Sequence, residues 1–193
     1  MSERAGWEQR HGAAGPPAPP SAFVVRWASR VHAQPGTSRT ALDLACGGGR
    51  HLAATAQVGW RPIGLDFARS AAGHAKALCP AARLVVGDAT VLPFRAQSFG
   101  LVVVSRFLDR PGLAGLGNLL VPGGVLVVET FLEDQHHATG HPSLRFCLAR
   151  GELAHLFATA PSPLVLEELE EGPCSSGPDT VHLVRAAARR PGP

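Results

Sequence analysis

Short apolar runs alternate with stretches of helical periodicity from residue 40 onward. Runs typical of buried strands occur at "TALDLAC", "PIGLD", "ARLVVGD", "FGLVVVSR" and "GGVLVVETF". The intervening "GRHLAATAQV", ended by Gly59, and "ARSAAGHAKAL", ended by Pro80, predict helices, and "GLAGLGNLL" predicts a glycine-weakened one. This alternation predicts parallel βαβ units in a doubly wound, Rossmann-like α/β sheet with helices on both faces.

The two ends of the chain depart from this alternation. "RGELAHLFATA" predicts a helix, and the strands "LVLEELE" and "DTVHLVRA" follow without a helix between them. We therefore expect a hairpin at one edge of the sheet, which then has seven strands with an antiparallel last strand. Before residue 40, Phe23, Val24, Trp27 and Val31 predict an amphipathic helix with Ser21 as its N-cap, and a short helix is expected around Trp7.

This pattern divides the chain into three parts. Residues 1–20 form an N-terminal segment with a proline-rich linker, residues 21–188 a single domain, and residues 189–193 a C-terminal tail.

Composition and charge narrow the classes of function. The 193 residues are 45% hydrophobic, and no apolar run approaches the roughly 20 residues that span a bilayer. The net charge is +3 with scattered arginines, so a nucleic-acid partner is allowed but is not indicated. The four cysteines are far apart and form neither a disulfide framework nor a zinc signature. We therefore expect a cytoplasmic protein with reduced cysteines and no membrane contact; the oligomeric state is left open.

The stretch "LDLACGGGRH" lies at a predicted strand–turn–helix and combines an acidic residue with glycines. A dinucleotide fingerprint needs a third glycine where Leu52 stands, and a phosphate loop needs a lysine that is absent here. Asp43 would repel a phosphate but suits a ligand with positive charge and hydroxyls. Gly47 and Gly49 allow such a ligand to approach the backbone closely.

These residues resemble motif I of the class I S-adenosylmethionine-dependent methyltransferases, with Ala45 where that family usually has glycine. The later stretches "IGLDFARSA" and "VVGDAT" resemble the family's second and third strand ends. The resemblance implies that S-adenosylmethionine is the cofactor. It implies that Asp43 contacts the amino group of the cofactor's methionine part or holds the turn through water. It also implies that Asp66 binds the ribose hydroxyls and that Asp88 accepts from the adenine amino group. The full set implied to bind the cofactor is Asp43, Ala45, Cys46, Gly47, Gly49, Asp66, Phe67, Asp88, Ala89 and Ser105.

A narrower resemblance, to the small bacterial tellurite-resistance-like branch, rests on "RFLDRP", "VVETF" and "SLRFCLARGEL". Several members of that branch have a histidine where Asp109 stands. The residues expected to contact the acceptor are Arg106, Asp109, His137 and Arg145, with Arg106 and Arg145 as a possible clamp for an anion or, equally, as partners in structural ion pairs.

The histidine-rich stretch "FLEDQHHATGHPS" could hold a metal ion or a general base. Adjacent histidines in a loop rarely fix a coordination geometry, so we expect a polar loop and no metal. No catalytic residue is assigned, because the cofactor's methyl group is already activated and the protein must chiefly align the reactants. The resemblance implies methyl transfer to an acceptor, which we expect to be a small molecule. Two alternatives stay open: a non-catalytic module that binds an adenosyl ligand, and a nicotinamide-dependent oxidoreductase.

Overall fold

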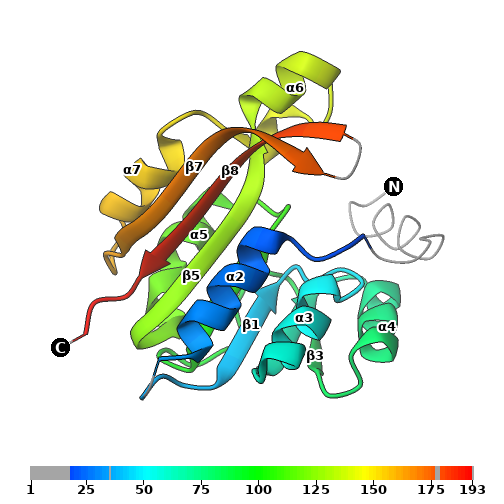
Figure 1. Ribbon diagram of the computed structural model, residues 1–193, viewed down its shortest axis with the longest axis vertical. Coiled ribbons are helices and arrows are strands. Elements are labelled where there is room, and N and C mark those ends of the chain that lie inside the picture. The colour runs from blue at the N-terminus through cyan, green and yellow to red at the C-terminus, as the bar shows by residue number, and fades with distance from the viewer. Residues whose placement is uncertain (1–17, 35, 177–178, 193) are drawn as a thin grey trace.

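A single mixed sheet organises the molecule (Figure 1). The computed structural model describes residues 18–34, 36–176 and 179–192. The strand order is β3-β2-β1-β4-β5-β8-β7, with the short β6 beside β5. The strands are β1 (Thr40–Leu44), β2 (Arg61–Asp66), β3 (Arg83–Val86), β4 (Phe99–Ser105), β5 (Leu120–Leu132), β6 (Cys147–Leu148), β7 (Val165–Ser176) and β8 (Asp179–Arg189). The predicted doubly wound sheet is confirmed. The two-residue β6, too short to leave a sequence pattern, is added to the seven predicted strands.

Helices cover both faces of the sheet, as predicted. On one face, buried side chains of α2 pack against β4 and β5, and α3 packs beside α2 (Figure 1). On the other face, α5, α7 and a 3-10 turn pack against the same central strands. The helices are α2 (Ala22–His32), α3 (Arg50–Val58), α4 (Arg69–Leu78), α5 (Arg110–Gly115), α6 (Glu133–Thr139) and α7 (Glu152–Ala158), and the 3-10 turns are η1 (Leu116–Leu119) and η2 (Leu144–Phe146).

The hairpin predicted at the end of the chain forms one edge of the sheet. β8 pairs antiparallel with β5, and β7 pairs antiparallel with β8. The register places Arg185 opposite both Glu129 of β5 and Glu170 of β7. Three strands thus bring one arginine between two glutamates.

One predicted loop is wrong: α6 occupies the histidine-rich stretch. Glu133 and Asp134 lie in its first turn, where negative charge favours a helix, and Gly140 ends it in the left-handed conformation. Local capping therefore outweighs the weak apolar pattern of this stretch.

The predicted helix around Trp7 lies outside the described residues. Within the described ranges, no helix combines the length and the apolarity that a membrane crossing requires.

Candidate functional site

Every second residue of the glycine-rich turn after β1 has a left-handed backbone conformation. Ala45, Gly47 and Gly49 have φ angles of 56°, 52° and 85°. A Cβ on Gly49 would lie 2.8 Å from Ala75 of α4, so this glycine is also required where α3 and α4 pack together. The turn places the start of α3 beside the carboxyl end of β1.

Cys46 takes part in this turn through its backbone. Its N–H donates to the carbonyl of Leu65, and its carbonyl accepts from Gly49. Its side chain is buried in an apolar cluster with Leu52 and Ala75, and burial raises the pKa of the thiol. The Cys46 thiol thus faces the core and not a ligand.

Asp43 is a buried carboxylate with an unused oxygen. The residue is only 4% exposed, and among the residues that the structure describes its Oδ2 has no hydrogen-bond partner. Burial raises the pKa of Asp43 to about 7, Arg50 opposes that rise, and Asp66 adds to it. An orphaned buried oxygen of this kind fits a cationic group on a ligand, as predicted for this residue.

Asp66 holds the turn and retains capacity for a ligand. Its Oδ2 accepts from the N–H of Gly47 at 2.8 Å, and its Oδ1 accepts from the N–H of Ala68 at 2.9 Å. A carboxylate offers about four acceptor sites, so two remain for the pair of ribose hydroxyls.

Asp88 lies at the end of the next strand and is exposed. Its Oδ1 accepts from the backbone and the hydroxyl of Thr90, both at 2.8 Å, and these bonds lower its pKa. Phe67 is half-buried just after β2, and Ala89 is buried beside Asp88. The structure therefore brings the three predicted acids to the carboxyl ends of three adjacent strands, β1, β2 and β3.

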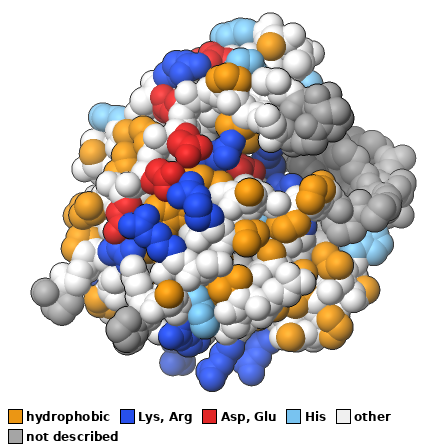
Figure 2. Space-filling view, viewed as in Figure 1, with side chains coloured by type: hydrophobic (Ala, Val, Ile, Leu, Met, Phe, Trp, Pro, Cys, Tyr) orange, Lys and Arg blue, Asp and Glu red, His pale blue; other side chains and the backbone are white. Residues whose placement is uncertain are grey.

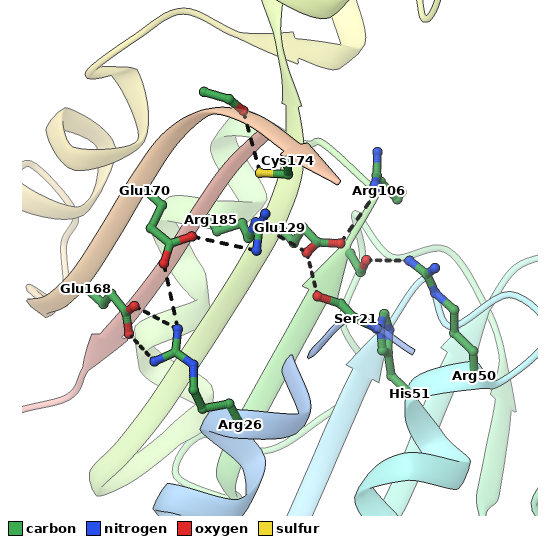
Figure 3. A network of polar contacts seen from close by, with 12 residues as sticks. Ser21, Arg26, Arg50, His51, Arg106, Glu129, Glu168, Glu170, Cys174 and Arg185 are labelled. Atoms are coloured by element: carbon green, nitrogen blue, oxygen red, sulfur yellow. Dashed lines mark hydrogen bonds and ion pairs between the residues drawn. The ribbon is translucent and has the colours of Figure 1, made fainter. Parts of the chain in front are cut away.

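A second cluster of polar residues lies along the same edge of the sheet, where α2 begins (Figure 3). Ser21 is at the predicted N-cap position, but its hydroxyl donates to Glu129 Oε2 at 2.6 Å and caps no helix N–H. Its backbone N–H donates to His51 Nε2 at 3.2 Å. Burial, with Arg50 and Arg106 nearby, lowers the pKa of His51 to about 3, so the ring is a neutral acceptor.

Arg50 and Ser105 connect the two clusters of polar residues. Arg50, the first residue of α3, donates to Ser105 Oγ at 3.1 Å and to the carbonyl of Pro19 at 3.2 Å. Ser105 ends β4, as predicted. The Arg50 guanidinium thus spans from the start of α3 to β4 and to the segment that leads into α2 (Figure 3).

Arg106 follows β4 and reaches towards β5. Its backbone is left-handed, with φ of 59°, and its N–H donates to the carbonyl of Glu129 at 2.8 Å. Its Nε lies 3.7 Å from Glu129 Oε1, and its guanidinium lies 4.3 Å from the centre of the Phe131 ring. Burial lowers its pKa. The predicted partner in a clamp, Arg145, is instead exposed on η2, over the ring of Phe146.

The other two residues predicted for the acceptor have different surroundings. Asp109 is the N-cap of α5 and accepts from the N–H of Gly112 at 3.0 Å. His137 is exposed on α6, where its ring meets that of His136 edge to face. Over the residues that the structure describes, no group of His, Cys, Asp and Glu is arranged to hold a metal ion.

The sequence interpretation missed four residues of the site: Arg50, His51, Glu129 as the centre of a network, and Arg185. Two signals could have found them. Glu129 and Arg185 are charges inside otherwise apolar strands, "VLVVETF" and "VHLVRAAA". Arg50 and His51 open the helix that follows the glycine turn, where side chains lie next to the strand ends.

Comparison with known proteins agrees with this geometry. Residues 41–124 match a family model described as a methyltransferase domain. A demethylmenaquinone methyltransferase of Beutenbergia cavernae is 39% identical over 104 residues, which are 51% of this chain and 42% of that protein. The chain spans less than half the length of the curated relatives it matches.

Solved structures share the whole fold. One of them concerns the conversion of a disulfide bond into a thioacetal group during echinomycin biosynthesis. It has a TM-score of 0.71 at 21% identity, over 97% of this chain and 90% of that one. Geranyl diphosphate C-methyltransferase of Streptomyces coelicolor, with Mg²⁺, geranyl diphosphate and S-adenosyl-L-homocysteine, has a TM-score of 0.66 at 16% identity, over 86% and 78%. Residues 41–124 are therefore similar to a methyltransferase domain, and the chain shares its Rossmann-like fold with these solved structures.

Proposed function

We propose that the protein transfers the sulfonium methyl group of S-adenosylmethionine to a small-molecule acceptor. The observation that carries this proposal is the row of Asp43, Asp66 and Asp88 at adjacent strand ends, with Oδ2 of Asp43 buried and unpartnered. A cationic ligand with hydroxyls satisfies these carboxylates, whereas a phosphate would be repelled. The matched methyltransferase domain supports the same cofactor.

Each carboxylate has a separate part in holding the cofactor. Asp66 offers its two remaining acceptor sites to the ribose hydroxyls while its other bonds fix the turn. Asp88, with Ala89 beside it and Phe67 nearby, faces the adenine. Asp43 pairs with the ammonium group. When bound, S-adenosylmethionine supplies a methyl group already activated by a positive sulfur, so the chain has to provide alignment and shelter from water.

The acceptor and the narrower branch are part of the proposal. A small molecule is supported by the names of the demethylmenaquinone and geranyl diphosphate methyltransferases among the similar proteins. Membership of the tellurite-resistance-like branch rests on "RFLDRP" and the neighbouring motifs. Within that motif Asp109 caps α5, which gives it a structural role irrespective of the acceptor.

Calorimetry with S-adenosylmethionine, S-adenosylhomocysteine and NADH tests the proposal. The two sulfur compounds should bind the wild type and NADH should not. Asp66→Ala should weaken binding of the sulfur compounds by about 10-fold or more, because hydrogen bonds to a charged acceptor are worth about 1.5–3 kcal/mol. Binding of NADH alone would refute the proposal.

Asp109→Ala is the matched control. Like Asp66, Asp109 accepts from a backbone N–H, so each substitution removes a carboxylate that holds the local backbone. Asp109→Ala should reduce the stability of the fold by about 1 kcal/mol and leave cofactor affinity unchanged. An equal loss of affinity in both variants would mean that Asp66 acts through general stability. Incubation with labelled S-adenosylmethionine and a panel of acceptors then separates an enzyme from a non-catalytic module.

A further inference from the structure

The carboxyl ends of the parallel strands form one edge of the sheet, and the two halves of this edge carry side chains of opposite charge. On the side of β1, β2 and β3 it carries carboxylates: Asp43, Asp66 and Asp88. On the side of β4, β5 and β8 it carries Arg106 and Arg185 around the carboxylate of Glu129, with Arg50 nearby (Figure 3). The ammonium and sulfonium groups of the proposed cofactor suit the first half. The arginines of the second half suit an anionic group instead.

Arg106 and Arg185 have N–H donors that remain available for a ligand. A guanidinium carries five N–H donors. Within the described part of the chain, the guanidinium of Arg106 has only the 3.7 Å ion pair with Glu129, which is too long for a hydrogen bond. Arg185 lies 3.9 Å from the other oxygen of Glu129, and its buried Nε has no hydrogen-bond partner. Both side chains are partly buried, with exposed fractions of 25% and 20%, so these donors are only partly hydrated.

Internal carboxylates do not satisfy this cluster. The short hydrogen bond of Glu129, at 2.6 Å, is accepted from the hydroxyl of Ser21. Glu170, which lies 3.7 Å from Arg185, is also 3.8 Å from Arg26 and is nearly half exposed. Glu170 is a residue of β7, whose glutamates form ion pairs with Arg26, Arg185 and Arg189, and Figure 2 shows acidic and basic side chains gathered in this region. Arg106 and Arg185 thus share the buried carboxylate of Glu129 through ion pairs that are too long for hydrogen bonds, which leaves N–H donors for an anion.

The backbone and the aromatic neighbours fix Arg106 in this arrangement. A left-handed backbone costs a non-glycine residue about 1–2 kcal/mol, and the bond from its N–H to Glu129 holds it there. The Phe131 ring covers one face of the guanidinium, and Phe23 lies 5.9 Å from that of Arg185. Stacked guanidiniums present their N–H edges, which match the oxygens of a carboxylate or a phosphate.

We propose that the methyl acceptor is an anionic small molecule, and that Arg106 and Arg185 bind its carboxylate or phosphate group at the carboxyl ends of β4 and β5. This inference rests on the proposed function, because it assigns the acceptor of the same reaction. Glu129 then has a second effect: it competes with the ligand for the two arginines when the acceptor is absent. Arg106 and Arg185 are binding residues and take no part in the transfer itself.

Titration with simple oxyanions tests this site directly. We would titrate sodium phosphate and sodium succinate separately into the protein by calorimetry, with and without saturating S-adenosylhomocysteine. Saturable binding of phosphate indicates a phosphorylated acceptor, and saturable binding of succinate indicates a carboxylate. Arg106→Gln and Arg185→Gln should each weaken the anion that binds by about 10-fold or more, since charge-assisted bonds are lost. Affinity for S-adenosylhomocysteine should change by less than about twofold in both.

Two further variants make the test specific. Arg61→Gln removes an exposed arginine at the start of β2, at the opposite edge of the sheet, and should leave anion affinity unchanged. Glu129→Gln should strengthen anion binding by about threefold or more, because it frees the arginines while the amide oxygen still accepts from Ser21. Arg185→Gln and Glu129→Gln carry the test if Arg106→Gln does not fold.

The outcomes separate the two proposals. No saturable binding of either anion, an equal loss in Arg61→Gln, or weaker binding in Glu129→Gln would overturn the anionic acceptor. Failure of the wild type to bind S-adenosylhomocysteine would instead overturn the proposed function, whatever the titrations without that ligand show.

Discussion

The pKa of Asp43 predicts that cofactor affinity depends on pH. Burial raises this pKa to about 7, so a neutral carboxyl and a carboxylate coexist near neutrality. Only the carboxylate can pair with the ammonium group of the ligand. With a pKa of about 7, roughly one-tenth of Asp43 is ionised at about pH 6 and roughly three-quarters at about pH 7.5. Because apparent affinity scales with the competent fraction, the dissociation constant should fall about eightfold between these two values.

The stability of the free protein should change in the opposite direction. The pKa of Asp43 is higher in the folded protein than its ordinary value of 3.8. The contribution to stability is therefore complete below the unfolded pKa and is lost as the pH rises through about 7. Rising pH thus lowers the Asp43 contribution to folding while it raises affinity for the ligand.

Calorimetry with S-adenosylhomocysteine at several pH values measures this effect. Titrations in two buffers with different protonation enthalpies also count the protons released on binding. At about pH 6 the wild type should release close to one proton per ligand. Asp43→Asn should bind weakly at every pH and release no proton. Asp88→Asn is the control, since the pKa of Asp88 is lowered and lies far from this window. A wild-type affinity that does not vary between pH 6 and pH 7.5 would refute the role given to Asp43.

Three further predictions concern the turn and the start of α2. Ala45→Gly should raise the free energy of unfolding by about 0.5–1 kcal/mol in urea denaturation, since the left-handed backbone favours glycine; a loss of stability would contradict the strain assigned to Ala45. Gly49→Ala should lower the melting temperature by several degrees or prevent folding, because its Cβ would lie 2.8 Å from Ala75; an unchanged melting temperature would show that α3 and α4 can separate. Ser21→Ala should cost about 1.5–3 kcal/mol of stability by the same denaturation assay, because it removes a 2.6 Å bond to the buried Glu129; a change below about 0.5 kcal/mol would mean that the bond contributes little.

Most of the fold follows from local patterns in the sequence. The apolar runs predict the long strands, and Gly59 ends α3 in the left-handed conformation expected of a helix stop. The antiparallel hairpin is predicted because two strands follow each other without a helix. Two short elements escaped: β6 spans two residues and carries no period, and α6 depends on its first-turn acids and on Gly140 more than on an apolar face.

The two halves of the site differ in how far the sequence predicts them. Asp43 is the next-to-last residue of β1, Asp66 is the last residue of β2, and Asp88 lies two residues after β3. A repeated local motif therefore points to one place. The arginine cluster is non-local. Glu129 and Arg185 meet because β5 and β8 pair in one particular register, and Ser21 reaches Glu129 across 108 positions of the chain. No spacing along the sequence encodes such a meeting.

The four residues predicted to contact the acceptor lie in different parts of the structure. Arg106 follows β4, whose end lies beside Glu129, and the structure places it in the second half of the site. Asp109, only three residues later, already caps α5, and His137 and Arg145 lie on exposed segments beyond β5. The structure thus brings Arg106 to the cluster around Glu129, and the acceptor contacts expected of Asp109, His137 and Arg145 stay predictions.

A crystal structure with S-adenosylhomocysteine tests the central claim most directly, because the claim is that a charge-divided edge holds the cofactor on its acidic half. The account predicts ribose hydroxyls within hydrogen-bond distance of Asp66, an ammonium group at Oδ2 of Asp43, and the sulfur directed towards Arg106 and Glu129. An adenosyl group bound away from Asp43 and Asp66, or a sulfur directed away from the arginine cluster, would contradict it.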